Sequence, residues 1–183
     1  MPPVTIPSAS EMVAAIDAAI DARAPLLRVG SSGIHPRAVL QAIAHVESGY
    51  GRQWAASKHE EAYCYGGPYY KGDGPGGRMG DDVLRRLTDQ WGCSAHESWG
   101  PWQVLYITAW EHGYRDDPVR LRMPSVSIGP VIEVLNRRMF DRGHTAPGPR
   151  DVFDAWNSGR ARDRIVPEDY IRKAMPHYER LVA

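Results

Sequence analysis

The chain has 183 residues, which is enough for one domain with a sizeable buried core, and we expect a single domain over 1–183. Its 22 Lys and Arg residues balance its 22 Asp and Glu residues. This balance argues against a protein that binds nucleic acid or a membrane surface through a basic field. No stretch is apolar for long enough to span a bilayer, so we expect no membrane insertion.

Helical patterns dominate the chain. Ser8 and Glu11 form a capping box before the first amphipathic segment. Pro36 stands where a second helix begins, and Gly49 or Gly51 ends that helix. Further helices are expected over 81–91, 104–113, 128–141, 149–158 and 167–181. No segment alternates convincingly with a period of two, so we expect an all-α fold.

Two regions depart from this helical pattern. Residues 1–35 form an N-terminal helix and a linker, and residues 52–97 form a long, loop-rich insertion. The glycine-rich run over 72–77 is not followed by Gly-Lys-Ser/Thr, so it is no phosphate-binding loop. We interpret the insertion as a flap beside a groove or, equally, as a surface loop without a role.

The insertion contains the two cysteines of the chain and two histidines, namely His59, Cys64, Cys93 and His96. Their spacing, His-x4-Cys and Cys-x2-His, could close a tetrahedral zinc site. One disulfide between the cysteines, or two free thiols, is the interpretation that we favour. We therefore expect no cofactor.

Glu47 is the residue whose position first indicates chemistry. It follows Ile43 by four residues and Leu40 by seven, so it shares their apolar helix face. Burial raises the pKa of a carboxyl group, and the last turn of a helix disfavours negative charge. The position therefore predicts a glutamic acid that is protonated near neutral pH, as a general acid must be. The alternative is an ordinary solvated Glu at a helix end.

Three motifs occur in a characteristic order. Residues 42–51 read Ala-Ile-Ala-His-Val-Glu-Ser-Gly-Tyr-Gly, residues 98–104 read Ser-Trp-Gly-Pro-Trp-Gln-Val, and residues 155–159 read Ala-Trp-Asn-Ser-Gly. They resemble the Glu-Ser helix end, the Ser-x-Gly-x-x-Gln motif and the Ala-Tyr-Asn-Ala-Gly motif of the lysozyme-like superfamily. The resemblance covers roughly 36–175 and is nearest to soluble lytic transglycosylases and goose-type lysozymes. It implies a lysozyme-like fold with two lobes and a substrate groove.

The resemblance also implies a function, which is cleavage of peptidoglycan glycan strands between N-acetylmuramic acid and N-acetylglucosamine. Glu47 would be the catalytic acid. The residues that would bind substrate are Ser48, Ser98, Trp102, Gln103, Trp156, Asn157 and Tyr170. For any single Trp among them, packing in the core is the interpretation that we favour over stacking on a sugar. A lytic transglycosylase is the expected type, with a lysozyme-type muramidase and an endo-N-acetylglucosaminidase as alternatives. Because no secretory signal is written at the N-terminus, we expect an enzyme that is carried in a bacteriophage virion or released at lysis.

One departure from the family pattern concerns the third motif. The family carries Tyr where this chain has Trp156, and that hydroxyl helps to orient the catalytic Glu. An indole N–H can donate a hydrogen bond but cannot accept one, so Tyr170 is a candidate for the orienting role. The departure also leaves open a different class of protein, a non-catalytic glycan-binding or structural virion protein that has kept the fold. The sequence does not indicate an oligomeric state.

Overall fold

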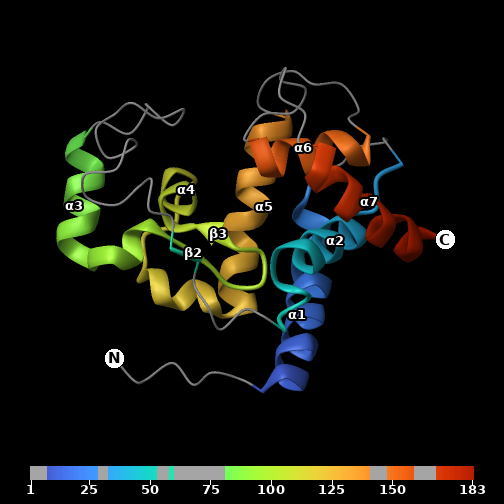
Figure 1. Cartoon of the computed structure of the whole chain (residues 1–183), viewed down its shortest axis with the longest axis horizontal. Coiled ribbons are helices and arrows are strands. Elements are labelled where there is room, and N and C mark those ends of the chain that lie inside the picture. The colour runs from blue at the N-terminus through green and yellow to red at the C-terminus, as the bar shows by residue number, and fades with distance from the viewer. Residues whose placement is uncertain (1–7, 29–32, 53–57, 60–80, 141–147, 159–167) are drawn as a thin grey trace.

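The computed structural model describes residues 8–28, 33–52, 58–59, 81–140, 148–158 and 168–183. In these residues helices dominate, as the sequence predicted (Figure 1). The α-helices are α1 (Ala9–Arg23), α2 (Pro36–Ser48), α3 (Asp81–Trp91), α4 (Tyr106–Glu111), α5 (Pro124–Phe140), α6 (Pro149–Ser158) and α7 (Glu168–Val182). Short 3-10 helices are η1 (Ala24–Leu26), η3 (Gly92–His96) and η4 (Pro118–Arg122), and the strands are β1 (Lys58–His59), β2 (Glu97–Trp99) and β3 (Val104–Leu105).

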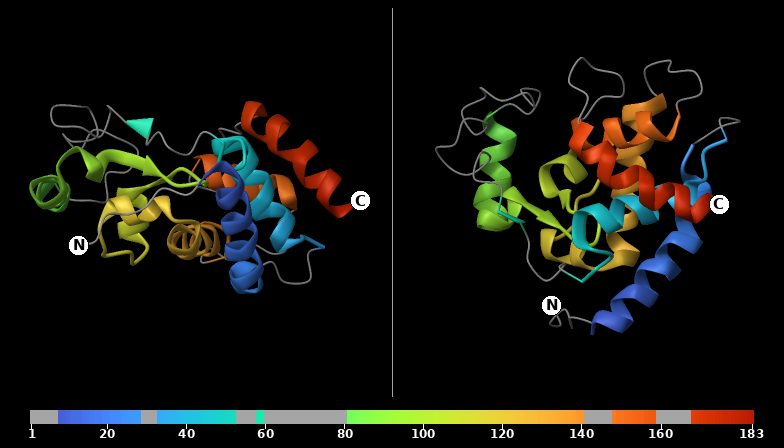
Figure 2. Two further views of the ribbon diagram at one scale, coloured as in Figure 1. Left: turned by 90° about the horizontal axis from the view of Figure 1, so that it is seen from below. Right: turned by 45° about the vertical axis from the view of Figure 1, so that its right-hand side comes forward.

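The helix α5 runs through the middle of the molecule. The helices α3 and α4 and the strands β2 and β3 lie on one side of it, and α1, α2, α6 and α7 lie on the other (Figures 1 and 2). On the second side, α2 packs mainly against α7, and α6 packs against both α5 and α7. The end of α2, the end of α6 and the start of α7 are thereby brought together. In the described part of the chain, no helix combines the length and the apolar character that crossing a bilayer requires.

The ends of α1 and α2 follow the local signals in the sequence. Ser8 and Glu11 form the predicted capping box, and the hydrogen bonds from Ser8 hold the pKa of the Glu11 carboxyl below its usual value. Pro36 occupies the first turn of α2, and Gly49 ends this helix in the left-handed conformation, with φ 57°. Local chemistry therefore sets the start and the end of the helix that carries Glu47.

The mainly helical fold agrees with the all-α expectation, and the described residues add one small antiparallel sheet in the order β1-β2-β3. Ser98 of β2 lies opposite Lys58 of β1 on one side and Leu105 of β3 on the other. The strands have only two or three residues, so they are too short to show an alternating pattern. Because residues 104 and 105 pair in the sheet, α4 begins at Tyr106. In contrast, α5 begins earlier than predicted, because Pro124 fits the first turn of a helix.

The turn between β2 and β3 requires glycine at position 100. Gly100 has φ +73°, and a Cβ atom built there would lie 2.2 Å from the carbonyl oxygen of Leu121. We therefore expect Gly100→Ala to lower the free energy of unfolding by more than about 1–2 kcal/mol, the penalty of the left-handed conformation alone. Urea denaturation measures the loss.

Gly129 provides the matched control for this substitution. It lies within α5, and a Cβ atom built there meets no atom within 4 Å. Gly129→Ala should cost less stability than Gly100→Ala, because Ala is the better helix former and only the restriction that Pro130 places on the residue before it opposes this gain. Equal effects of the two substitutions would contradict a special role for the turn at Gly100.

Candidate functional site

Glu47 is the second-last residue of α2 and is partly buried. The turn that follows it is held by Ser48, whose Oγ donates to Ala44 O at 3.0 Å and accepts from the Gly51 amide at 2.9 Å. The sequence placed Ser48 among the substrate-binding residues. Its side chain is instead 1% exposed and closes the helix end, so it fixes the backbone beside Glu47.

A second anchor of this turn comes from α1 and was not anticipated from the sequence. Tyr50 has φ 60°, and its hydroxyl donates to Asp17 Oδ1 at 2.6 Å. Gln41 Nε2 donates to both the Asp17 carboxylate and the Tyr50 oxygen, each at 3.2 Å. Burial raises the pKa of the Tyr50 hydroxyl, so this group stays a protonated donor. The end of α2 is therefore fastened to α1.

The carboxylate of Glu47 is the point where three helices meet. Its Oε1 accepts a hydrogen bond from Trp156 Nε1 of α6 at 2.8 Å and another from Tyr170 OH of α7 at 2.9 Å. These donors are 109 and 123 residues away from Glu47 along the chain. The structure thus brings together Glu47 of the first motif, Trp156 of the third motif and Tyr170.

The two donors determine which oxygen of Glu47 carries the proton in the acid form. Trp156 can only donate through its N–H. Burial, followed by the charge of Glu47 and the hydrogen bond to it, raises the pKa of the Tyr170 hydroxyl well above its usual value, so Tyr170 is a phenol near neutral pH. Oε1 of Glu47 therefore acts as an acceptor twice, and the proton of the acid form belongs on Oε2.

Arg138 of α5 binds the backbone of α6 at Trp156. Its Nη1 donates to the carbonyl oxygen of Trp156 at 2.9 Å and to that of Ala155 at 3.3 Å. Carbonyls at the end of a helix lack partners within the helix, so a cation there stabilises the end of α6. The sequence shows only an Arg near a helix end, and its partner lies on another helix, so this role was not predicted.

The second motif is a structural turn that rests on α2. Trp102 is 0% exposed, and its Nε1 donates to Leu40 O at 2.9 Å. The ring of Trp102 therefore lies in the core, the interpretation favoured for any single Trp of these motifs, and offers no face to a ligand. Gln103 Nε2 donates to Gly100 O at 2.9 Å within the same turn, and Ser98 is 6% exposed in β2. The motif thus fixes its own turn and docks it on the helix of Glu47.

The third motif divides between the site and the surface. The Trp156 side chain is 8% exposed, so its ring packs inside and its N–H points at Glu47. Asn157, the next residue, is exposed. Among the residues that the sequence assigned to substrate binding, Asn157 is exposed, Gln103 and Tyr170 are partly buried, and the others are buried.

Two of the four candidate zinc ligands cannot be placed, because Cys64 and the side chain of His59 lie outside the described residues. Cys93 is exposed. His96 is 1% exposed, and its ring Nε2 lies 2.8 Å from Thr88 Oγ1. Among the described residues, no three His, Cys, Asp or Glu side chains are grouped as a metal ion would require.

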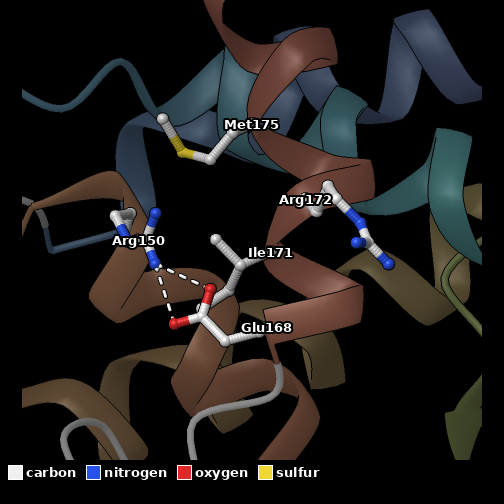
Figure 3. A pocket seen from close by; sticks show the side chains of 5 residues that line it. All are labelled: Arg150, Glu168, Ile171, Arg172 and Met175. Carbon is white, nitrogen blue, oxygen red and sulfur yellow. Dashed lines mark hydrogen bonds and ion pairs between the residues drawn. The ribbon is translucent and has the colours of Figure 1, made fainter.

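A cavity of about 270 Å³ opens between the starts of α6 and α7, near Tyr170 in sequence (Figure 3). Arg150 and Glu168 face each other across it with two hydrogen bonds of 3.1 and 3.0 Å, while Arg172 points away from that pair. Both partners are more than half exposed, so this ion pair contributes little stability. Glu47 does not line this cavity.

Comparisons of the chain with family models, with curated proteins and with solved structures found no match. The function must therefore be argued from the residues that meet at Glu47.

Proposed function

We propose that the protein is a glycosidase that cleaves the β-1,4 bond between N-acetylmuramic acid and N-acetylglucosamine in peptidoglycan, as a lytic transglycosylase does. One observation carries the proposal. A single oxygen of Glu47 accepts hydrogen bonds from Trp156 and Tyr170, which come from two other helices. A general acid must be held in a fixed orientation toward the bond that it protonates, and two donors on one oxygen supply that orientation.

The arrangement of the three motifs gives further support. Trp102 of the second motif donates to Leu40 of α2, and Trp156 of the third motif donates to Glu47 at the end of the same helix. All three motifs thus assemble on α2. This agrees with a lysozyme-like fold in which the parts on either side of α5 are the two lobes.

The mechanism needs one carboxyl group. Glu47 gives the proton on Oε2 to the glycosidic oxygen, and the bond from this oxygen to C1 of the muramic acid breaks. The resulting carboxylate is stabilised by the N–H of Trp156 and the O–H of Tyr170. It then takes the proton of the C6 hydroxyl while O6 forms a bond to C1. Glu47 is an acid again, and the product is a 1,6-anhydro ring.

The product identifies the reaction. Purified sacculi digested with the protein should release anhydro-muropeptides, which mass spectrometry distinguishes because they are lighter by one water than hydrolysis products. An inverting hydrolase would need a second carboxylate roughly 6.5–9.5 Å from the first.

The other possible products each point to a different enzyme. Reducing muramic acid ends would overturn the transglycosylase and favour a muramidase, with Glu97 of β2 the first base to test. Reducing N-acetylglucosamine ends would favour an endo-N-acetylglucosaminidase. Sacculi that bind the protein but release nothing would favour the non-catalytic class.

The donor at position 156 can be tested separately. Trp156→Phe keeps an aromatic ring but removes the N–H that Glu47 accepts. A hydrogen bond to a charged group contributes roughly 1.5–3 kcal/mol, so we expect the rate of sacculus digestion to fall by about 10- to 100-fold. Since the lost bond favoured the ionised carboxylate, the alkaline limb of the pH–rate profile should move to higher pH.

Trp156→Tyr is the matched control, because its hydroxyl restores a donor of the kind that the family carries. We expect it to regain part of the activity lost in Trp156→Phe. If both variants digest sacculi at the parental rate and with the parental pH profile, Trp156 does not position Glu47.

A further inference from the structure

A second cavity, of about 520 Å³, lies where the ends of α2 and α7 meet. It is lined by His45, Gly49, Arg52, His177, Arg180 and Leu181. Every titratable or charged side chain in this set is basic. Glu47 does not line the cavity, although it is close in sequence to His45, so the cavity is separate from the proposed catalytic carboxylate.

Two of the lining residues, His45 and His177, belong to a stack of aromatic rings. His45 stacks on Tyr50 at 4.4 Å between centroids and on His177 at 4.5 Å, with only 7° between the two imidazole planes. Arg180 Nη2 donates to His177 Nδ1 at 2.9 Å, and Arg180 Nε donates to Pro176 O at 3.3 Å. These bonds orient the guanidinium group of Arg180 before any ligand arrives.

Both histidines hold a proton less readily than a free imidazole does. Burial lowers the pKa of His45 first, then the charges of His177, Arg180 and Arg52 lower it further, and Asp17 opposes them. Burial and Arg180 likewise lower the pKa of His177. A negative charge beside the stack would favour the protonated form of His45, whereas His177 cannot carry a proton on Nδ1 while that atom accepts from Arg180.

The positive charge here is not balanced. Within the described residues, neither Arg52 nor Arg180 forms an ion pair with a carboxylate. Other described arginines do have such partners, namely Arg37, Arg120, Arg150 and Arg172. A cation at a helix C-terminus commonly complements the dipole of that helix. At the end of α2 the carbonyls of Ala44 and His45 accept bonds from the Tyr50 and Gly49 amides, so Arg52 is not needed to satisfy those two groups.

We propose that this basic cavity binds a tetrahedral oxyanion of the phosphate type, held by the guanidinium groups of Arg52 and Arg180 beside the His45–His177 stack. Planar guanidinium groups bind phosphate oxygens in pairs, and a dianion matches the two arginines in charge. The anion also favours the protonated form of His45, so binding takes up a proton there, while His177 stays neutral because its Nδ1 accepts from Arg180. The proposal does not depend on the activity of Glu47.

Sulfate is the probe that tests this coupling, because it remains a dianion between pH 5 and 8 and its own titration does not interfere. Calorimetric titration at constant ionic strength, set with chloride, should show saturable binding. The affinity should increase from pH 7.5 to pH 5.5, by up to about tenfold if the anion raises the pKa of His45 by one unit. Inorganic phosphate should compete with sulfate. A lack of saturable binding at both pH values would overturn the proposal.

Variants locate the site. Arg52→Gln and Arg180→Gln should each weaken sulfate binding at least about tenfold, as expected for the loss of a charge-assisted contact. Arg172→Gln is the matched control, because Arg172 is an exposed arginine of α7 that pairs with Asp169 outside the cavity. Circular dichroism verifies that each variant is folded, and the exposed Arg52 gives a second test if Arg180→Gln does not fold.

Three results would count against the proposal. Equal losses in Arg172→Gln and in the cavity variants would show a non-specific charge effect. Succinate that binds more tightly than sulfate would make this a carboxylate site. Loss of sulfate binding in Glu47→Gln would place the anion at the catalytic carboxylate; we expect that variant to bind sulfate normally, whatever its activity on sacculi.

Discussion

Glu47→Gln is expected to lower the rate of sacculus digestion by about 100- to 10,000-fold, the usual contribution of a general acid. The amide has nearly the shape of the carboxyl group but no proton to give. Its oxygen can still accept the hydrogen bonds that Trp156 and Tyr170 donate to Oε1. The fold should therefore be retained, and the loss should appear in turnover rather than in stability.

The control for this experiment is Glu133→Gln. Glu133 is an exposed residue of α5 that the mechanism does not use, so it controls for the replacement of a Glu by Gln as such. It should digest sacculi at the parental rate, and thermal unfolding should show that both variants are folded. A Glu47→Gln variant that digests sacculi as fast as the parent would remove Glu47 from the proposed mechanism.

The helix ends were predictable because the signals that set them are local. Ser8 and Glu11 lie three residues apart and satisfy each other, and Pro36 and Gly49 act at their own positions. The strands could not be predicted, because β1 and β3 have two residues each and owe their conformation to pairing with β2. An alternation of polar and apolar residues can be recognised only in a longer strand.

The candidate site was accessible from the sequence only where a motif carried the information. The motifs identified Glu47 and Trp156, and chemical reasoning about the missing hydroxyl pointed to Tyr170. Arg138 was missed, since its partners are backbone carbonyls of another helix. Asp17 was missed for the related reason that it anchors Tyr50 over 33 residues of chain. Residues that position a site through tertiary contacts leave no local pattern.

The place of Trp102 also depends on a tertiary contact that the sequence does not show. A Trp in a motif near a sugar site can stack on substrate or pack in the core, and the residue type alone does not distinguish them. The partner that decides is the carbonyl of Leu40, which lies 62 residues away. With 0% of its surface exposed, Trp102 has no face left for a glycan.

Trp102→Ala is therefore expected to destabilise the protein by about 3–5 kcal/mol, as does loss of a large aromatic side chain from a core. Natural domains are stable by only about 5–15 kcal/mol, so the variant should be close to the limit of folding. In a chain of this length, the melting temperature should fall by on the order of 10 °C. Denaturant and thermal unfolding measure both quantities.

Two further variants separate packing from substrate contact. Trp102→Phe keeps much of the ring but loses the N–H donated to Leu40 O, so we expect a smaller loss of stability than in Trp102→Ala. Trp110→Ala removes an indole that is only partly buried, and should also cost less. If Trp102→Ala unfolds like the parent but binds glycan strands more weakly, Trp102 contacts the substrate and its place in the core is contradicted. If it unfolds early, the turn of the second motif depends on α2 for its place, because Trp102 is the side chain that joins them.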